Sequence, residues 1–188
     1  MILKQAGDYR STLRQLALDY YHRRISFIDF RLRMVASIGS GLTEAWLSGR
    51  EIWGITQGLT FPERLVLYRE ISREIRYIQG LSTAIDVLAN GGKDIDLISR
   101  RLDLWGDAFI RTQELSKTYN GKDQFLRWVL NPAEHCGTCL SLEGKVQTAR
   151  QWLAMGYYPK SWSLDCGQGC KCGLELTQAP VSEQELNA

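Results

Sequence analysis

The sequence lacks several features that would decide its class at once. Only two of the 188 residues are histidine and four are proline. No apolar run approaches the roughly 20 residues that a membrane-spanning helix needs, and the chain turns polar after residues 1–3, so we expect no secretory signal peptide. With 23 basic and 21 acidic residues, the formal net charge of +2 does not indicate a nucleic-acid-binding protein. We therefore expect a globular chain with no membrane segment.

Catalytic motifs are missing as well. The chain has no phosphate-binding G-x-x-x-x-G-K-[ST] loop, no G-x-G-x-x-G opening a helix, no H-E-x-x-H and no G-x-S-x-G. With only two histidines, the chain offers few candidates for the general base of Ser-His or Cys-His catalysis. The set Pro132, His135, Cys136 and Cys139 resembles part of the zinc deaminase signature, but His22 is followed by two arginines and not by x-Glu. We predict that the protein is not an enzyme.

Cysteine is confined to one 37-residue window, and the first 135 residues contain none. The five residues form a C-x2-C pair and a C-x3-C-x-C set: Cys136, Cys139, Cys166, Cys170 and Cys172. A C-x2-C turn directs two thiolates at one point, as tetrahedral Zn2+ requires, and glycines in the second set permit a tight turn. We predict a structural zinc site with four of the five cysteines as ligands, closed to water and therefore not catalytic.

Two other interpretations of the cysteines stay open. Disulfides could form after release from a reducing cell, although an odd number would leave one thiol unpaired. The thiols could also be unliganded. His135 directly precedes Cys136 and could replace a thiolate, but a surface or hydrogen-bonded role is the favoured interpretation.

Hydrophobic periodicity predicts a helical domain or arm over residues 1–122. A long helix is expected over residues 9–50, loosened at 39–41 by two glycines. Its apolar seam is expected to comprise Tyr21, Ile25, Ile28, Leu32 and Val35. The next helix should begin at Thr60, with Glu63 as capping-box partner and Pro62 in the first turn, and end near Gly80. Its seam is expected to comprise Leu65, Tyr68, Ile71, Ile75 and Ile78.

A turn at residues 90–92 separates this region from a last long helix. That helix is expected to begin after Asp94 and to end before Asn120, with an apolar seam at Ile95, Ile98, Leu102, Trp105 and Phe109. Residues 1–50 carry eight basic and four acidic side chains, and residues 131–188 carry four and six. We expect the basic side chains of residues 1–50 to lie on a solvated helix face.

Residues 123–176 are predicted to form a small α+β module that zinc stabilises, and residues 177–188 a flexible tail. Residues 125–130 indicate a strand, with a helical turn as the alternative. A return strand is expected at 145–147, a helix capped by Thr148 over 149–155, and a last strand at 171–176. The predicted fold class is mainly α: long N-terminal helices followed by this module.

The module resembles the C-terminal part of tailed-phage minor head proteins, the Mu F-like or head-morphogenesis family. The resemblance runs over residues 128–176. It is carried by Trp128-Val129, His135-Cys-Gly-Thr-Cys139, Leu142-Glu-Gly-Lys-Val146, Gln151-Trp152, Pro159 and Cys166-Gly-Gln-Gly-Cys-Lys-Cys-Gly-Leu174. The family pattern is a strand ending in C-x2-C, an L-x-G-K-V turn and a closing C-[RK]-C strand. Cys166 stands where many members have histidine, at a spacing one residue longer.

The resemblance implies a virion structural protein that is made in the host cytoplasm. It would contact the portal or the major capsid protein, and copies of itself, near the packaged DNA, and act in head assembly or in genome packaging or ejection. A zinc module that binds nucleic acid is the alternative function, but the net charge of −2 over residues 131–188 argues against it. A capsid-associated or connector protein of other ancestry is a third possibility.

Overall fold

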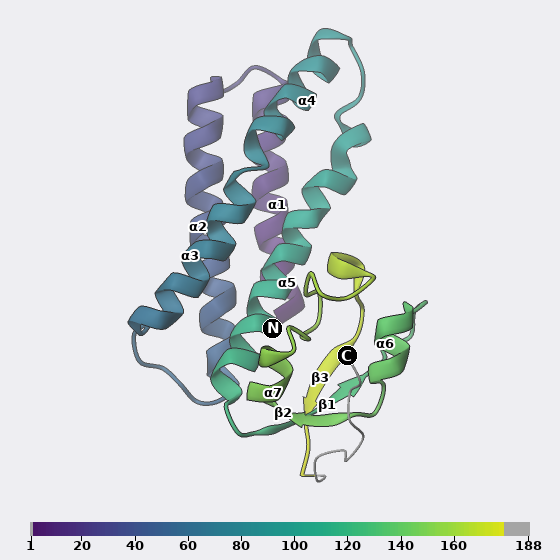
Figure 1. The fold of residues 1–188 in the computed structure, drawn as a ribbon. Helices are drawn as coiled ribbons and strands as arrows, with labels where there is room; N and C mark the ends of the chain where they lie inside the picture. The colour runs from purple at the N-terminus through teal and green to yellow at the C-terminus, as the bar shows by residue number, and fades with distance from the viewer. Residues whose placement is uncertain (1, 179–188) are drawn as a thin grey trace.

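The computed structural model describes residues 2–178 and shows a helical bundle with a small α+β module at one end (Figure 1). The helices of the bundle are α1 (Ile2–Tyr21), α2 (Phe27–Glu51), α3 (Phe61–Ile75), α4 (Ile78–Asn90), the 3-10 helix η1 (Ile95–Ile98) and α5 (Ser99–Gly121). The elements of the module are β1 (Phe125–Val129), α6 (Gly137–Leu142), β2 (Val146–Thr148), α7 (Ala149–Ala154), the 3-10 turn η2 (Gly167–Gly169) and β3 (Gly173–Leu176). The predicted fold class, mainly α with a small α+β module, is confirmed.

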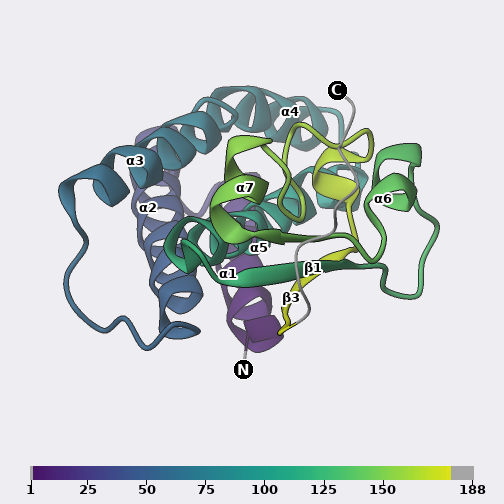
Figure 2. The same cartoon turned by 60° about the horizontal axis from the view of Figure 1, so that its bottom comes forward.

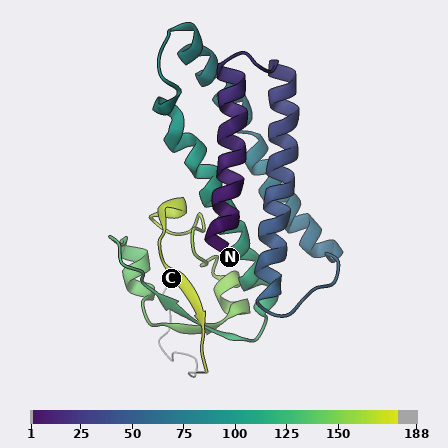
Figure 3. The ribbon, with the colours of Figure 1, turned by 180° about the vertical axis from the view of Figure 1, so that it is seen from behind.

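The first two helices form an antiparallel hairpin (Figure 3), and the prediction of one helix over 9–50 is wrong. The chain turns between α1 and α2, where Arg23 takes a positive φ of 58° and Ser26 caps α2 by accepting the Asp29 amide. The predicted break at 39–41 is absent, and α2 continues through it. Gly41 faces Tyr9 of α1 so closely that a Cβ would meet the ring. This glycine therefore permits close packing of two helices.

The apolar seam predicted for this segment is also partly wrong. Ile28 and Leu32 are 68% and 64% exposed, whereas Phe30, Met34 and Ile38 form the buried face of α2. Both sets recur with helical spacing, and only the packing of α2 against α1 and α5 decides which set is covered.

Helix α3 begins as predicted, with the complete capping box between Thr60 and Glu63 and a proline in the first turn. It ends at Ile75, and α4 begins three residues later and runs through Gly80, so the predicted end at Gly80 is wrong. The predicted turn at 90–92 is present, and α4 ends at Asn90.

The buried face of α3 differs from the predicted apolar seam. Leu65 and Tyr68 are exposed, and the face turned inward carries three buried acids, Glu63, Glu70 and Glu74. Arg50 lies 3.0 Å from Glu63, and the fully buried Arg111 bonds to the other two carboxylates at 3.3 and 2.7 Å. Acidic residues therefore occupy a core face because buried guanidinium groups from α2 and α5 lie opposite them.

Helix α5 is the central element of the bundle, and its predicted seam is confirmed. All five seam residues, from Ile95 to Phe109, are buried. Asp94 caps η1 by accepting the Asp96 amide. Residues 95–98 form η1, so α5 begins at Ser99, later than predicted. The helix ends at Gly121, two residues later than predicted, and its end leads directly into the module.

The module contains a three-stranded antiparallel sheet in the order β2-β1-β3. The register pairs Leu126 with Gln147 on one side and with Leu176 on the other. The three predicted strands and the Thr148-capped helix are confirmed, and residues 125–129 are strand and not a helical turn. Helix α6 was not predicted. Helix α7 packs on the sheet (Figure 2). The ring centroids of Trp152 in α7 and Trp128 in β1 are 5.7 Å apart.

Two hydrophobic clusters correspond to these parts. The larger lies among α1–α5, and the smaller is centred on Trp128, Trp152 and the cysteines. The boundary predicted at residue 122 falls between α5 and β1. Most of the predicted tail, residues 179–188, lies outside the described residues.

Candidate metal centre

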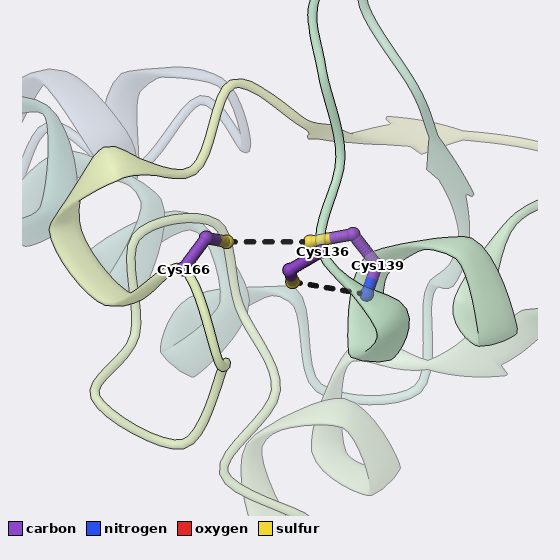
Figure 4. Close-up of side chains that lie close together, drawn as sticks. All are labelled: Cys136, Cys139 and Cys166. Atoms are coloured by element: carbon purple, nitrogen blue, oxygen red, sulfur yellow. Dashed lines mark hydrogen bonds between the residues drawn. The ribbon is translucent and has the colours of Figure 1, made fainter.

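The first pair of thiols lies where the chain leaves the β1 loop and enters α6. Cys136 is the N-cap residue of α6, and its Sγ accepts the Cys139 amide at 3.5 Å (Figure 4). Cys139 is fully buried one turn later. The C-x2-C pair therefore lies at the start of α6, and both of its sulfurs face Cys166 of the second set.

The second set of thiols comes from a tight turn that leads into β3. The 3-10 turn η2 separates Cys166 from Cys170, and Gly167 adopts a φ of +48° that favours glycine. Cys172 directly precedes β3. The turn and the strand thus bring these three thiols to the C-x2-C pair, 27 or more residues away in sequence.

A hydrogen-bonded clamp joins the two cysteine loops. The carboxylate Oδ2 of Asp165 accepts hydrogen bonds from the Thr138 amide at 3.1 Å and from its hydroxyl at 2.5 Å. These bonds hold the pKa of Asp165 below its usual value. Thr138 lies inside the C-x2-C motif and Asp165 directly precedes Cys166, so the clamp fixes the separation of the loops beside the sulfurs. No motif in the sequence marks this pair, although both residues adjoin cysteines.

The sulfurs have the spacing of a tetrahedral thiolate site. The Sγ atom of Cys139 lies 3.6 Å from that of Cys166 and 3.7 Å from that of Cys170. With Zn–S bonds of about 2.3 Å, a tetrahedral zinc site separates its sulfurs by about 3.8 Å. A disulfide would need about 2.05 Å, and all five cysteines are free thiols. The donor set and its spacing therefore fit a metal ion, and the structure holds no disulfide among these residues.

All five predicted residues take part in this arrangement, in two overlapping triads. The first triad is Cys136, Cys139 and Cys166, and the second is Cys139, Cys170 and Cys172. Within each triad every sulfur lies within 4.8 Å of the others. Cys139 is the one residue that belongs to both triads.

Burial and hydrogen bonds shift the pKa values of the thiols in different directions. Burial acts to raise the pKa of Cys136, but the hydrogen bonds from the Cys139 amide and from neighbouring thiols outweigh it and lower that pKa to about 7. Burial raises the pKa of Cys166 to about 12, and it also raises the pKa values of Cys139 and Cys172. Most of these thiols therefore hold their protons at neutral pH, and a bound cation would release them.

His135 is also part of the cluster. Its Nδ1 lies 3.4 Å from the Sγ of Cys172, and its Nε2 lies 2.8 Å from the backbone oxygen of Asn131. The favoured hydrogen-bonded role of His135 therefore agrees with the contact to Asn131, while the contact to Cys172 places a sixth donor beside the thiols.

Two buried lysines connect the module to α5. Lys117 Nζ donates to the Leu174 oxygen of β3 at 2.9 Å. Lys160 Nζ bonds to the Asp107 carboxylate at 2.9 Å and donates to the Gln168 oxygen at 2.8 Å. Because Gln168 lies in the turn between two cysteines, the geometry of the thiol cluster is coupled to docking on the bundle. Neither lysine carries a sequence signal for this role.

An aromatic contact continues this interface. The ring of Trp162 packs against two guanidinium groups, with Arg111 at 5.0 Å and Arg73 at 5.6 Å from the ring centroid. Arg111 also neutralises the buried acids of α3, so the module covers the polar centre of the bundle.

None of the helices in residues 2–178 has the length and apolar character that a bilayer crossing requires. Comparisons of the chain with family models, with curated proteins and with solved structures found no match. A functional interpretation therefore depends on the residues and the geometry of this chain.

Proposed function

We propose that residues 123–176 form a module that structural zinc holds together and that serves as a docking platform at the end of the bundle. The observation that carries this proposal is the convergence of two thiols of the second cysteine set on Cys139 of the first, at 3.6 and 3.7 Å. Soft thiolate ligands in tetrahedral arrangement select zinc or iron–sulfur clusters, and zinc needs no redox partner. Because thiolates fill every position of such a site, no position is left for a reacting water.

The size of the module explains why it would need a metal. Its core consists of ten buried residues, three of which are cysteines. Zinc binding contributes about 10–16 kcal/mol to the folding of zinc-finger peptides, which is more than so small a core supplies. Zinc would thus stabilise both the loops of the module and its contacts with α5.

The biological setting we propose is a bacteriophage virion, with this chain as a minor head protein. The support for it is the resemblance of residues 128–176 to the head-morphogenesis family, including the C-x2-C pair and the closing Cys170-Lys-Cys172 segment. The partners would be the portal or the major capsid protein and further copies of the chain, close to packaged DNA. The role would be in head assembly or in genome packaging or ejection, through protein–protein contacts and without catalysis.

The outer face of α3 is the surface we propose for the partner protein. Phe61, Leu65 and Tyr68 are spaced as one helical stripe and are all exposed, and the neighbouring Arg64 and Arg69 are exposed too. The three acids of the same helix are buried, so its outer face is apolar and positively charged. A capsid or portal surface with apolar pockets and carboxylates would complement it.

Metal analysis tests the first part of the proposal. Protein purified under reducing conditions should contain at least one zinc per chain, and folded, reduced protein without zinc would exclude the site. Little binding to bare DNA is expected at physiological salt. Tight binding that weakens steeply with salt would instead favour the nucleic-acid alternative.

A particle reconstruction tests the second part. The chain should appear at the portal or on the inner capsid surface, and its absence from purified particles would contradict the virion role. Leu65→Glu on α3 should reduce incorporation into particles, whereas Val87→Glu, at a position on α4 that is 63% exposed, should not.

A further inference from the structure

We propose that the cluster binds two metal ions that share the Cys139 thiolate, and that His135 is a ligand of the second ion. This inference rests on the proposed zinc function but adds a second site to it. One tetrahedral ion uses four donors, while this cluster brings five thiols and one imidazole together.

The arrangement of the sulfurs favours two centres over one. The two triads meet only at Cys139. An ion within the first triad would leave Cys172 without metal, and an ion within the second would leave Cys136 without metal. A thiolate sulfur has enough lone pairs to bind two ions, so Cys139 can serve both.

The surroundings of His135 are those of a metal-ligating histidine. Such residues almost always donate the second ring N–H to a carboxylate, a backbone carbonyl or water, which fixes the tautomer. Here Nε2 lies 2.8 Å from the Asn131 carbonyl oxygen, so Nδ1 presents its lone pair on the side of Cys172. The Nδ1–Sγ distance of 3.4 Å is close to the separation of about 3.5 Å between nitrogen and sulfur in one tetrahedral zinc site.

The six donors suffice for two four-coordinate ions if two thiolates are shared. Cys170 is the second candidate bridge, because its sulfur lies 3.7 Å from that of Cys139. It lies outside the first triad, so binding of the first ion would draw its sulfur toward that triad. One ion would then have Cys136 and Cys166 as its own ligands, and the other Cys172 and His135.

Charge also favours the filled cluster. Five thiolates around two divalent ions have a net charge of −1, whereas four thiolates around one ion have −2 and leave a thiol over. Cys139, Cys170 and Cys172 are buried, and a smaller net charge costs less to bury.

The test is the number of ions per chain in the full-length, reduced protein, measured by native mass spectrometry and elemental analysis during titration with zinc. We expect two ions per wild-type chain. His135→Ala should bind one ion, or bind the second at least tenfold more weakly. The matched control is His22→Ala, since His22 is the other histidine and is exposed at the end of α1; this variant should keep two ions.

Cadmium-113 NMR gives a second readout that does not depend on a variant. Two resonances with a scalar coupling between the cadmium ions are expected, because a shared sulfur transmits that coupling. Two uncoupled resonances would overturn the bridging role of Cys139. A full second site in His135→Ala would overturn the assignment of the histidine. A single ion per wild-type chain would overturn this inference and leave the proposed function intact, whereas no ion at all would overturn both.

Discussion

The helical bundle and the cysteine module differ in the size and composition of their cores. The bundle buries apolar side chains from five long helices, from Ala6 in α1 to Leu115 in α5. The module has one small sheet, two short helices and a core centred on two tryptophans and its thiols. Burial of apolar area grows with the size of a domain, so we expect the module to depend more strongly on a bound ion than the bundle does.

Polar groups in the two interiors show the same difference. In the bundle, Arg111 neutralises Glu70 and Glu74 within one network of side chains. In the module, the buried thiols Cys139, Cys170 and Cys172 form one triad that contains no charged side chain. The first network pairs its buried charges within the protein, and the second offers donors for an ion.

The largest effect is expected from Cys139→Ser, because Cys139 belongs to both triads. The variant should lose zinc and the fold of the module while keeping the helical signal of the bundle. Elemental analysis, far-UV circular dichroism and the fluorescence of Trp128 and Trp152 would measure this. Ser141→Ala, an exposed change on the same short helix, is the control, and a Cys139→Ser protein with a native module would contradict the dependence on metal.

Arg111→Met should have the largest effect on the bundle. It leaves Glu70 and Glu74 buried without their shared partner, and breaking such a pair costs about 3–5 kcal/mol. The free energy of unfolding from denaturant titration measures the loss. Arg73→Met removes a partly exposed partner of the same Glu70, and its cost should stay below about 1 kcal/mol; equal costs for the two variants would contradict the role of burial.

Glu63→Gln should give a smaller loss that depends on pH. Burial acts to raise the pKa of Glu63, but hydrogen bonds from Thr60 and Trp46 together with the charge of Arg50 outweigh it, so the folded-state pKa lies below its ordinary value. The carboxylate therefore adds stability above its unfolded pKa of roughly 4.3, and this stability is lost as the pH falls through the folded pKa.

At neutral pH the Glu63→Gln variant should be less stable than the wild type by about 1–3 kcal/mol. The difference should shrink below about pH 4. Thermal or denaturant unfolding across pH would follow it, with the exposed Glu51→Gln as control. A difference that is constant with pH would show that the charge of Glu63 is not the cause.

The smallest effects concern two glycines of α2. Nothing lies within 4 Å of a Cβ added at Gly39, so Gly39→Ala should stabilise the protein by about 0.5–1 kcal/mol through helix propensity. Gly41→Ala should destabilise it, because the new Cβ would meet the ring of Tyr9. Melting temperatures that change in the same direction for both variants would contradict this difference.

Local signals in the sequence predicted much of the fold. The capping box at Thr60, the cap at Thr148, the seam from Ile95 to Phe109 and the three strands depend on neighbouring residues, and all are present. The wrong prediction for the buried face of α3 depends on distant partners. The burial of Glu70 and Glu74 follows from Arg111, about 40 residues away, and nothing in α3 alone indicates it.

The candidate metal site also has features that the sequence predicts and features that only the tertiary structure shows. The spacing of the cysteines was enough to predict a metal site with these five residues as candidates, because C-x2-C geometry is local. The sharing of Cys139 between two triads, the contact of His135 with Cys172 and the clamp from Asp165 to Thr138 join loops that are separated by 27 or more residues. These contacts arise only when the sheet and α7 bring the loops together, so the sequence by itself determined which atoms can bind a metal, and the tertiary structure decided how they are grouped.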